Sequence, residues 1–257
     1  MRTLRLLGFG FVLYLKMYSQ SAFDGLLAVL WPLFFSTVVF FMYGAGGDDP
    51  AILAYAALGA AVMGVWTATS VPASSALQRQ RWQGTLELLA AAPAHFGAVL
   101  LPMTIATATI GLYCIAATLL WSRFLFGIAL AVADPLVFVA AIAATILSIG
   151  MLGFLMAVSF VRYRTSWAIG AAAEYPVWLI CGFLVPVALL PDWVRPISWA
   201  LAPTWGMTAI RESANGGTPL PDLLACLALG GAYVAFGLLV LDTVLRSART
   251  RGSLSLT

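Results

Sequence analysis

Charged residues are scarce in this chain of 257 residues: they make up 9% of it, whereas soluble globular domains carry about 25%. Apolar residues account for 62%, and the mean hydropathy is +0.99. A soluble domain of this length could not cover so much apolar surface with so few charges. The composition therefore predicts a membrane protein and excludes a cytosolic enzyme.

Several other residue types are also nearly missing. Lysine and histidine occur once each, as Lys16 and His95. A P-loop needs a lysine after a glycine-rich loop, and Lys16 follows no such loop, so the chain is not expected to hydrolyse ATP by that route. The chain has no Gly-x-Ser-x-Gly motif, and a net charge of +3 spread along it predicts no nucleic-acid partner.

Cysteine is rare as well. Three widely spaced cysteines lie inside apolar runs, an arrangement that suits neither a disulfide framework nor a zinc site. They are Cys114, Cys181 and Cys226. We expect them to be buried between helices, and we expect no catalytic residue and no metal ligand in the chain.

Six apolar segments are long enough to cross a bilayer, which takes about 20 helical residues. They cover residues 25–43, 51–76, 98–120, 136–160, 165–190 and 223–245. The fifth contains Glu174, Pro176, Gly182 and Pro186, so it is not expected to form one straight helix, and Pro176 suggests a break beside Glu174. The sequence predicts an all-α polytopic membrane protein with six transmembrane helices in a single domain, residues 1–257.

Three further segments have the composition of interfacial structure. Residues 1–20 combine three cations with leucines and aromatics, which is typical of an amphipathic helix on the membrane surface. Residues 78–93 place Arg79, Gln83 and Glu87 on one helical face and Trp82 and leucines on another. Residues 186–212 carry tryptophans among prolines and charges, which predicts short interfacial or half-inserted helices.

The positions of the cations predict the topology. With both termini in the cytoplasm, three cations lie outside, namely Arg123, Arg195 and Arg211. The other ten lie inside, namely Arg2, Arg5, Lys16, Arg79, Arg81, Arg162, Arg164, Arg246, Arg249 and Arg251. This asymmetry agrees with the positive-inside rule.

Two blocks of sequence resemble one family. The first is RQRWQGTLELL at 79–89 with Pro93. The second is CGFLVP at 181–186, followed by LPDW at 190–193 and APT at 202–204. In order, spacing and the six-segment layout, the chain resembles the membrane subunits of type-2 ABC transporters, including bacterial drug, natural-product and polysaccharide exporters.

The resemblance implies that residues 78–93 form a coupling helix on a separate nucleotide-binding ATPase, which would hold the ATP and magnesium. By itself, the amphipathic pattern fits a plain interfacial helix equally well. The implied coupling residues are Arg79, Arg81, Trp82, Gly84, Thr85, Leu86, Glu87 and Leu89. Residues 186–212 would form a re-entrant outer hairpin, and a second copy or a sister permease would complete the translocation path.

Glu174 is the carboxylate expected within the bilayer, where a charged side chain costs about 2.5–3.5 kcal/mol on insertion scales. It is therefore expected to line a substrate or gating pathway, or to pair with an arginine or an unpaired backbone group. Pro176, Gly182 and Pro186 are the other translocation or gating candidates.

The expected function is ATP-driven export of a hydrophobic or amphipathic small molecule across a bacterial plasma membrane, with lipids around the chain. Arginine-rich, alanine-rich composition suggests the bacterial source. Three alternatives remain: export of a lipid-linked polysaccharide, a proton-coupled secondary transporter that uses Glu174, and a lipid enzyme that uses Glu174 with His95.

Overall fold

The structure is a computed structural model that describes residues 2–19, 22–44, 49–74, 80, 84, 97–128, 132–159 and 166–251. These residues form helices and connections, with no strand among them. The helices are α1 (Arg2–Ser19), α2 (Ala22–Gly44), α3 (Pro50–Ser74), α6 (Gly97–Leu125), α7 (Pro135–Ser159), α8 (Ser166–Ile180), the 3-10 turn η1 (Val187–Leu189), α9 (Arg195–Trp199), α10 (Ala202–Asn215) and α11 (Leu220–Arg251).

Each of the six apolar segments contains one α-helix, and the fifth also contains η1, so the all-α prediction is confirmed for the described residues. Within the described residues, α3, α6, α7 and the Leu220–Leu241 part of α11 are long and apolar enough to cross a bilayer. In α2, the apolar stretch Pro32–Gly44 is shorter than these four helices and is not one of the candidate spans. With 15 residues, α8 is about 22 Å long, less than the roughly 30 Å of a hydrocarbon core.

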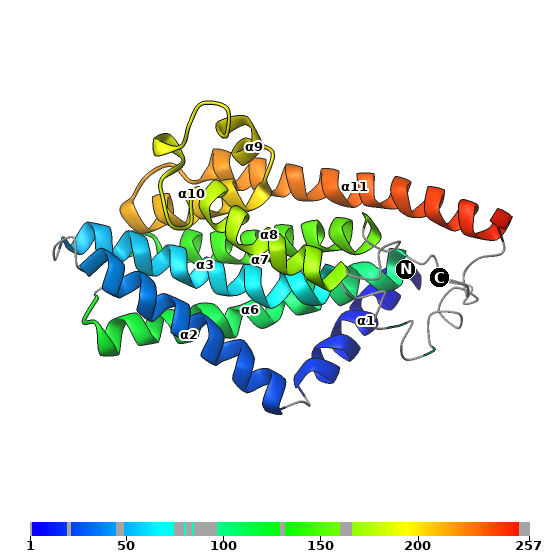
Figure 1. Cartoon of the computed structure of the whole chain (residues 1–257), viewed down its shortest axis with the longest axis horizontal. Coiled ribbons are helices and arrows are strands. Elements are labelled where there is room, and N and C mark those ends of the chain that lie inside the picture. The colour runs from blue at the N-terminus through cyan, green and yellow to red at the C-terminus, as the bar shows by residue number, and fades with distance from the viewer. Residues whose placement is uncertain are drawn as a thin grey trace.

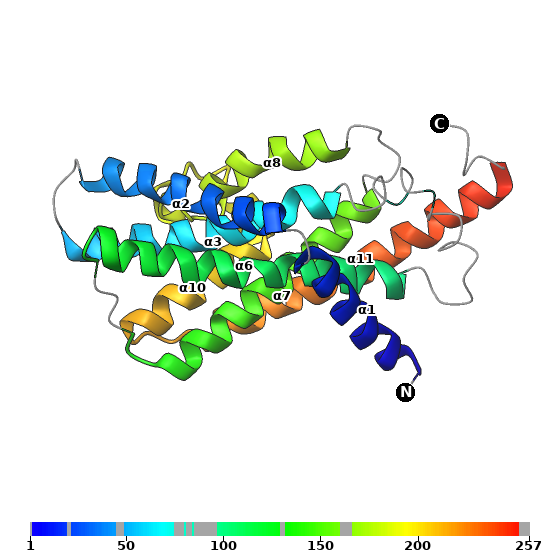
Figure 2. The ribbon, with the colours of Figure 1, turned by 90° about the horizontal axis from the view of Figure 1, so that it is seen from below.

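The long helices run side by side along the molecule, and α1 leans away from them (Figures 1 and 2). The start of α1 and the end of α11 both lie in the right-hand part of the two views. The short helices η1, α9 and α10 gather at the other end, above the bundle in Figure 1. Successive long helices run in alternating directions along the bundle (Figures 1 and 2).

Helix α3 is central, because it packs against α2, α6, α7, α8 and α10. Small residues let the helix backbones approach one another closely. A Cβ atom added at Gly111 of α6 would lie 2.7 Å from Val65 Cγ1 and 2.9 Å from Val65 Cα on α3. All three cysteines are buried, as predicted.

Helix α1 packs on α6, where Gly10 lies against Pro102 and Tyr14 is buried. Its other side is exposed and largely apolar, with Phe9 76% exposed. Helix α1 thus leans away from the bundle with an apolar side exposed (Figures 1 and 2), and the position of residues 1–20 on a membrane surface stays a prediction.

Gly111→Ala is expected to lower stability by about 1–3 kcal/mol, because the added methyl group would overlap the α3 backbone. Gly231→Ala is the matched control: it also lies in a helix, but nothing lies within 4 Å of its added Cβ, so its stability should rise slightly or stay unchanged. Thermal melting of the two variants in detergent measures the difference. Equal midpoints would contradict the close α3–α6 packing.

Candidate functional site

Helix α8 ends in a glycine-capped turn. Gly182 has φ +76°, a left-handed conformation that glycine adopts without a steric penalty. The Phe183 amide donates to the Trp178 carbonyl (3.2 Å) and the Gly182 amide to the Leu179 carbonyl (3.2 Å), which together form a Schellman motif. The fifth apolar segment is therefore interrupted at Gly182. This confirms the prediction that the segment does not form one straight helix.

The prediction of a break beside Glu174 is wrong. Helix α8 continues through Pro176 to Ile180. Proline removes one amide donor from the helix, a loss that the neighbouring structure of a membrane helix can accommodate. The glycine at 182, rather than the proline at 176, ends the helix.

Beyond this turn, the backbone carbonyls of residues 182–184 point at side chains from three other helices. Arg211 of α10 donates from Nη1 to the Gly182 carbonyl (2.7 Å) and from Nη2 to the Phe183 carbonyl (3.0 Å). The Tyr55 hydroxyl of α3 donates to the Gly182 carbonyl (3.0 Å), and the Tyr43 hydroxyl of α2 donates to the Leu184 carbonyl. We call this set of contacts the carbonyl clamp.

Arg211 is suited to this position by its charge and shape. The carbonyl end of a helix carries partial negative charge, which favours a cation. The guanidinium carbon lies 3.2 Å from the centre of the Tyr55 ring, a cation–π contact, and Nη2 lies 3.4 Å from the Tyr55 carbonyl. Burial lowers the pKa of Arg211 to about 10, so the side chain stays protonated at neutral pH.

The clamp leaves no room for a side chain at Gly59 of α3. A Cβ atom there would lie 2.0 Å from the Phe183 carbonyl oxygen and 3.2 Å from Arg211 Nη2. The backbone of α3 thus touches the end of α8 directly. No sequence motif marks Gly59, Tyr43 or Tyr55, and the sequence predicts Arg211 only as a charge on the outer side.

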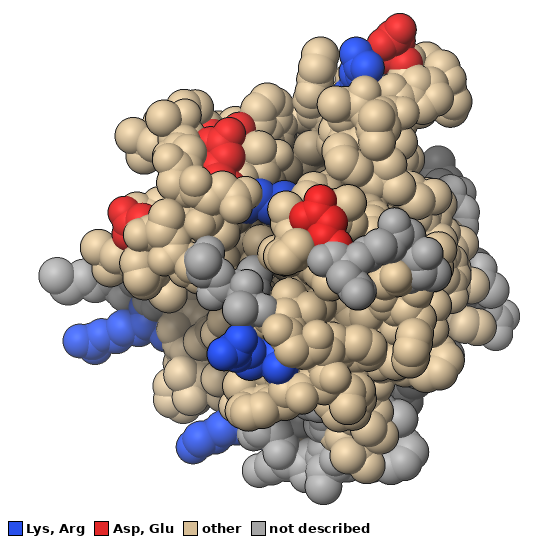
Figure 3. Space-filling view, turned by 90° about the vertical axis from the view of Figure 1, so that its left-hand side faces the viewer, with Lys and Arg blue, Asp and Glu red and all other residues tan. Residues whose placement is uncertain are grey.

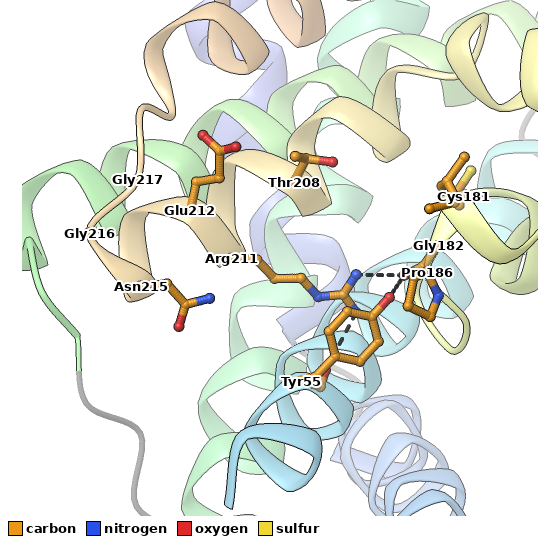
Figure 4. Close-up of a pocket in the computed structure, with 12 residues that line it drawn as sticks. Tyr55, Cys181, Gly182, Pro186, Thr208, Arg211, Glu212, Asn215, Gly216 and Gly217 are labelled. Carbon is orange, nitrogen blue, oxygen red and sulfur yellow. Dashed lines mark hydrogen bonds between the residues drawn. The ribbon is translucent and has the colours of Figure 1, made fainter.

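A pocket of about 430 Å³ opens beside the clamp (Figure 4). Among the predicted translocation residues, Gly182 and Pro186 line it, whereas Glu174 and Pro176 do not. The full lining is Tyr55, Cys181, Gly182, Pro186, Val187, Ala188, Thr208, Arg211, Glu212, Asn215, Gly216 and Gly217.

Glu174 lies elsewhere, on the side of α8 that faces α3. It is 8% exposed, and one of its carboxylate oxygens accepts a hydrogen bond from the Thr67 hydroxyl. One helical turn earlier, Gly170 meets Ser74 of α3 so closely that a Cβ atom would lie 2.2 Å from Ser74 Oγ. The partner seen for Glu174 is therefore a neutral hydroxyl on the central helix.

Most of the predicted coupling segment lies outside the described residues. This applies to Arg79, Arg81, Trp82, Thr85, Leu86, Glu87 and Leu89, and also to His95. Gln80 is helical and buried, and Gly84 is exposed with φ +67°. That left-handed conformation takes the backbone at Gly84 out of a right-handed helix.

The apolar helices, their alternating directions and the capped break of α8 define a polytopic α-helical membrane protein. The profile of the ABC-2 type transporter family matches residues 4–214, and the chain belongs to that family. The match runs from α1 into α10, so it includes the predicted coupling segment and the carbonyl clamp. None of the curated proteins compared with the chain matches it significantly.

Family membership confirms the resemblance of the two sequence blocks. The chain is a membrane permease of an ABC transporter, a class that works with an ATPase subunit. Its helices therefore provide the membrane part of a transporter whose energy comes from ATP.

Arg211→Gln is expected to lower the free energy of unfolding by about 2–5 kcal/mol, because it leaves buried carbonyls without their charged donor. Arg195→Gln is the matched control. Arg195 also binds a backbone carbonyl, of Ala188, and pairs with exposed Asp192 at 3.0 Å, so its loss should cost at most about 1 kcal/mol. Thermal melting compares the two, and equal losses would argue against the clamp.

Proposed function

We propose that this chain is the membrane-spanning subunit of an ATP-driven exporter that moves a hydrophobic or amphipathic small molecule out across the plasma membrane. The observation that carries this proposal is the family match over residues 4–214. The inventory of residues supports it, since a chain with Lys16 as its single lysine must use ATP through a separate subunit. ATP and magnesium would be held by that nucleotide-binding subunit.

Energy would enter through residues 78–93. Arg79, Arg81 and Glu87 would offer charged contacts to the ATPase, and Trp82 with Leu86 and Leu89 an apolar anchor. Gly84 and Thr85 lie between these groups. The left-handed backbone at Gly84 supports a bend there, which would present the two halves of the segment at different angles.

The translocation path would form between two permeases, either two copies of this chain or this chain and a sister permease. Helix α8 supports such a pairing because it lies at the edge of the bundle (Figure 2). Its outer side is apolar and exposed, with Trp167 at 52%, Tyr175 at 57% and Leu179 at 47%. A two-fold arrangement would place the same surface of each subunit against the other.

Switching between inward and outward access would require the outer end of the path to open and close. The carbonyl clamp supports a gating role for Gly182 and Pro186, since Arg211 holds the segment that joins α8 to η1 by the carbonyls of Gly182 and Phe183. ATP binding at the partner would shift the population between the two states by binding one of them more tightly.

Two further substrates or mechanisms compete with this proposal. A lipid-linked polysaccharide is an alternative cargo within the same family. A proton-coupled secondary transporter is favoured by one observation, the burial of Glu174 against Thr67, because a buried carboxylate can carry a proton. Transport that collapses with the proton gradient and needs no ATPase would establish that alternative.

Glu87→Ala is expected to uncouple the transporter: vanadate-sensitive export should fall about tenfold or more, while the chain still inserts and its partner still hydrolyses ATP. Gly84→Pro should act in the same direction, because proline requires a negative φ. Asp192→Ala, an exposed acid on the outer hairpin, is the control and should export normally. Normal export by both coupling variants would refute the role of this segment.

Glu174→Gln is expected to assemble normally, because the amide oxygen can still accept the hydrogen bond from Thr67. Its export should fall about tenfold if a carboxylate is needed in the pathway. Thr67→Val removes the hydroxyl but keeps the acid, and it should affect assembly more than Glu174→Gln does. Export and detergent-stable yield of the two variants separate the roles, and full export by Glu174→Gln would exclude Glu174 from transport.

A further inference from the structure

Glu174 has no charged partner in the part of the chain that the structure describes. It forms no ion pair there, and the hydrogen bond that it accepts comes from the neutral Thr67 hydroxyl. Figure 3, which views the molecule from the left-hand end of Figure 1, shows acidic and basic side chains on that surface, whereas Glu174 lies near the middle of α8. A charged side chain within a bilayer is costly, and Arg211 is already bound in the carbonyl clamp. A cation from outside the chain would offset that cost.

The carboxylate is accessible from one side of the contact between α3 and α8. Glu174 is 8% exposed, Thr67 is half-buried, and the Glu174 oxygen that Thr67 does not bind is not among the fully buried atoms that lack a partner. On α3, Gly64 meets α2, and Ser74 meets Gly170 of α8. At about 100° per residue, Thr67 lies about 60° around α3 from Gly64 and about 20° from Ser74, which places it between them. The accessible edge of the Glu174–Thr67 pair therefore faces the side of α3 that lies between α2 and α8.

Four aromatic rings form a row from α2 to α8, which we call the aromatic row. The ring centroids of Phe34 and Phe35 are 5.8 Å apart, and those of Phe35 and Trp178 are 5.1 Å apart. The Trp178 ring lies 5.1 Å from that of Tyr175, the residue that follows Glu174 in α8. Both ends of the row are accessible, since Phe34 is 61% and Tyr175 57% exposed. Trp178 comes one helical turn after Glu174, so the carboxylate and the aromatic row are neighbours on α8.

Each of these features has an ordinary structural explanation when it is taken alone. Edge-to-face rings, at 73° in both contacts of Trp178, pack helices together, and a hydroxyl can hold a buried carboxylate. The combination indicates a ligand, because exposed rings end beside a carboxylate that lacks an opposite charge. Aromatic faces attract cations, and a carboxylate attracts them more strongly. The outer side of α8 is apolar, with Leu179 47% exposed, so the rest of the ligand has to be apolar as well.

We propose that Glu174 and the aromatic row bind a lipophilic cation that carries aromatic groups, with its positive charge beside the Glu174 carboxylate and its rings against Tyr175. Thr67 holds one carboxylate oxygen and leaves the other for the cation. This inference rests on the proposed function and sharpens it, since it names the class of molecule that the exporter would take up. Glu174 would repel an anion of the same shape, and a neutral analogue would lack the Coulomb attraction. The site thus selects its ligand by charge as well as by apolar surface.

The test measures the binding of three probes to the purified full-length chain in detergent by equilibrium dialysis. Tetraphenylphosphonium is the cation, tetraphenylborate is an anion of nearly the same size and shape, and triphenylphosphine oxide is neutral. Dialysis against detergent without protein corrects for partition into micelles. We expect the cation to bind about tenfold more tightly than either of the others, the effect of one Coulomb contact. Equal binding of the three probes, or tighter binding of the anion, would overturn the proposal.

Two pairs of variants assign the selectivity to this site. Glu174→Gln should weaken tetraphenylphosphonium binding about tenfold and change binding of the neutral probe less than about twofold, which also shows that the variant is folded. Asp192→Asn, an exposed acid on the outer hairpin, should change neither. Tyr175→Leu should weaken binding of the cation about threefold or more, whereas Tyr175→Phe keeps the ring and the affinity. A cation preference that survives Glu174→Gln, or wild-type affinity in Tyr175→Leu, would overturn the site.

Transport then separates this inference from the proposed function. In vesicles with its ATPase, the wild-type chain should export tetraphenylphosphonium in a vanadate-sensitive manner, and Glu174→Gln should export it about tenfold more slowly. Selective binding of a cation that is not transported would overturn its role as cargo. Equal binding of the three probes would leave the proposed export function untouched, because the binding assay needs neither the ATPase nor transport. Movement of the bound cation that depends on the proton gradient and needs no ATPase would instead refute the ATP-driven function and leave the site in place.

Discussion

The end of this permease that holds the carbonyl clamp depends on how three backbone carbonyls at the end of α8 are hydrogen-bonded. A helix that stops in an apolar setting leaves carbonyls that water cannot satisfy, and each of them costs free energy until a donor is found. Arg211 provides that donor and joins α10 to α8, while Tyr55 and Tyr43 bring in α3 and α2. Four helices thus meet at a single cluster of hydrogen bonds.

This cluster gives α8 an unusual kind of attachment. At its end the helix is held by the partly buried cation of Arg211, and near its middle Glu174 binds the Thr67 hydroxyl of α3. Both contacts are directional, whereas apolar packing between helices is not. A movement of α8 along α3 therefore has to exchange specific hydrogen bonds, and this favours a small number of discrete positions over a continuous slide.

The broad fold could be predicted from the sequence because its cause is a local property, the long apolar runs interrupted by turn residues. The position of the break at Gly182 is harder to predict, because Pro176 and Gly182 both suggest the end of a helix. Proline is the stronger helix breaker, yet α8 continues through Pro176 and ends before Gly182. The clamp could not be predicted, because Arg211 binds backbone carbonyls, which every residue has and no sequence pattern marks. Gly59 matters only because another chain segment passes within contact distance.

That Arg211 binds main-chain atoms has a consequence for how this region tolerates change during evolution. The side chains of Phe183 and Leu184 take no part in the bonds that their carbonyls accept, so substitutions there leave these bonds available. The number of residues between Ile180 and Arg211 is more constrained, because an insertion or deletion would shift the guanidinium away from the carbonyls that accept its hydrogen bonds. A contact of this kind allows the residues between Ile180 and Arg211 to change in identity, while it restricts changes in their number.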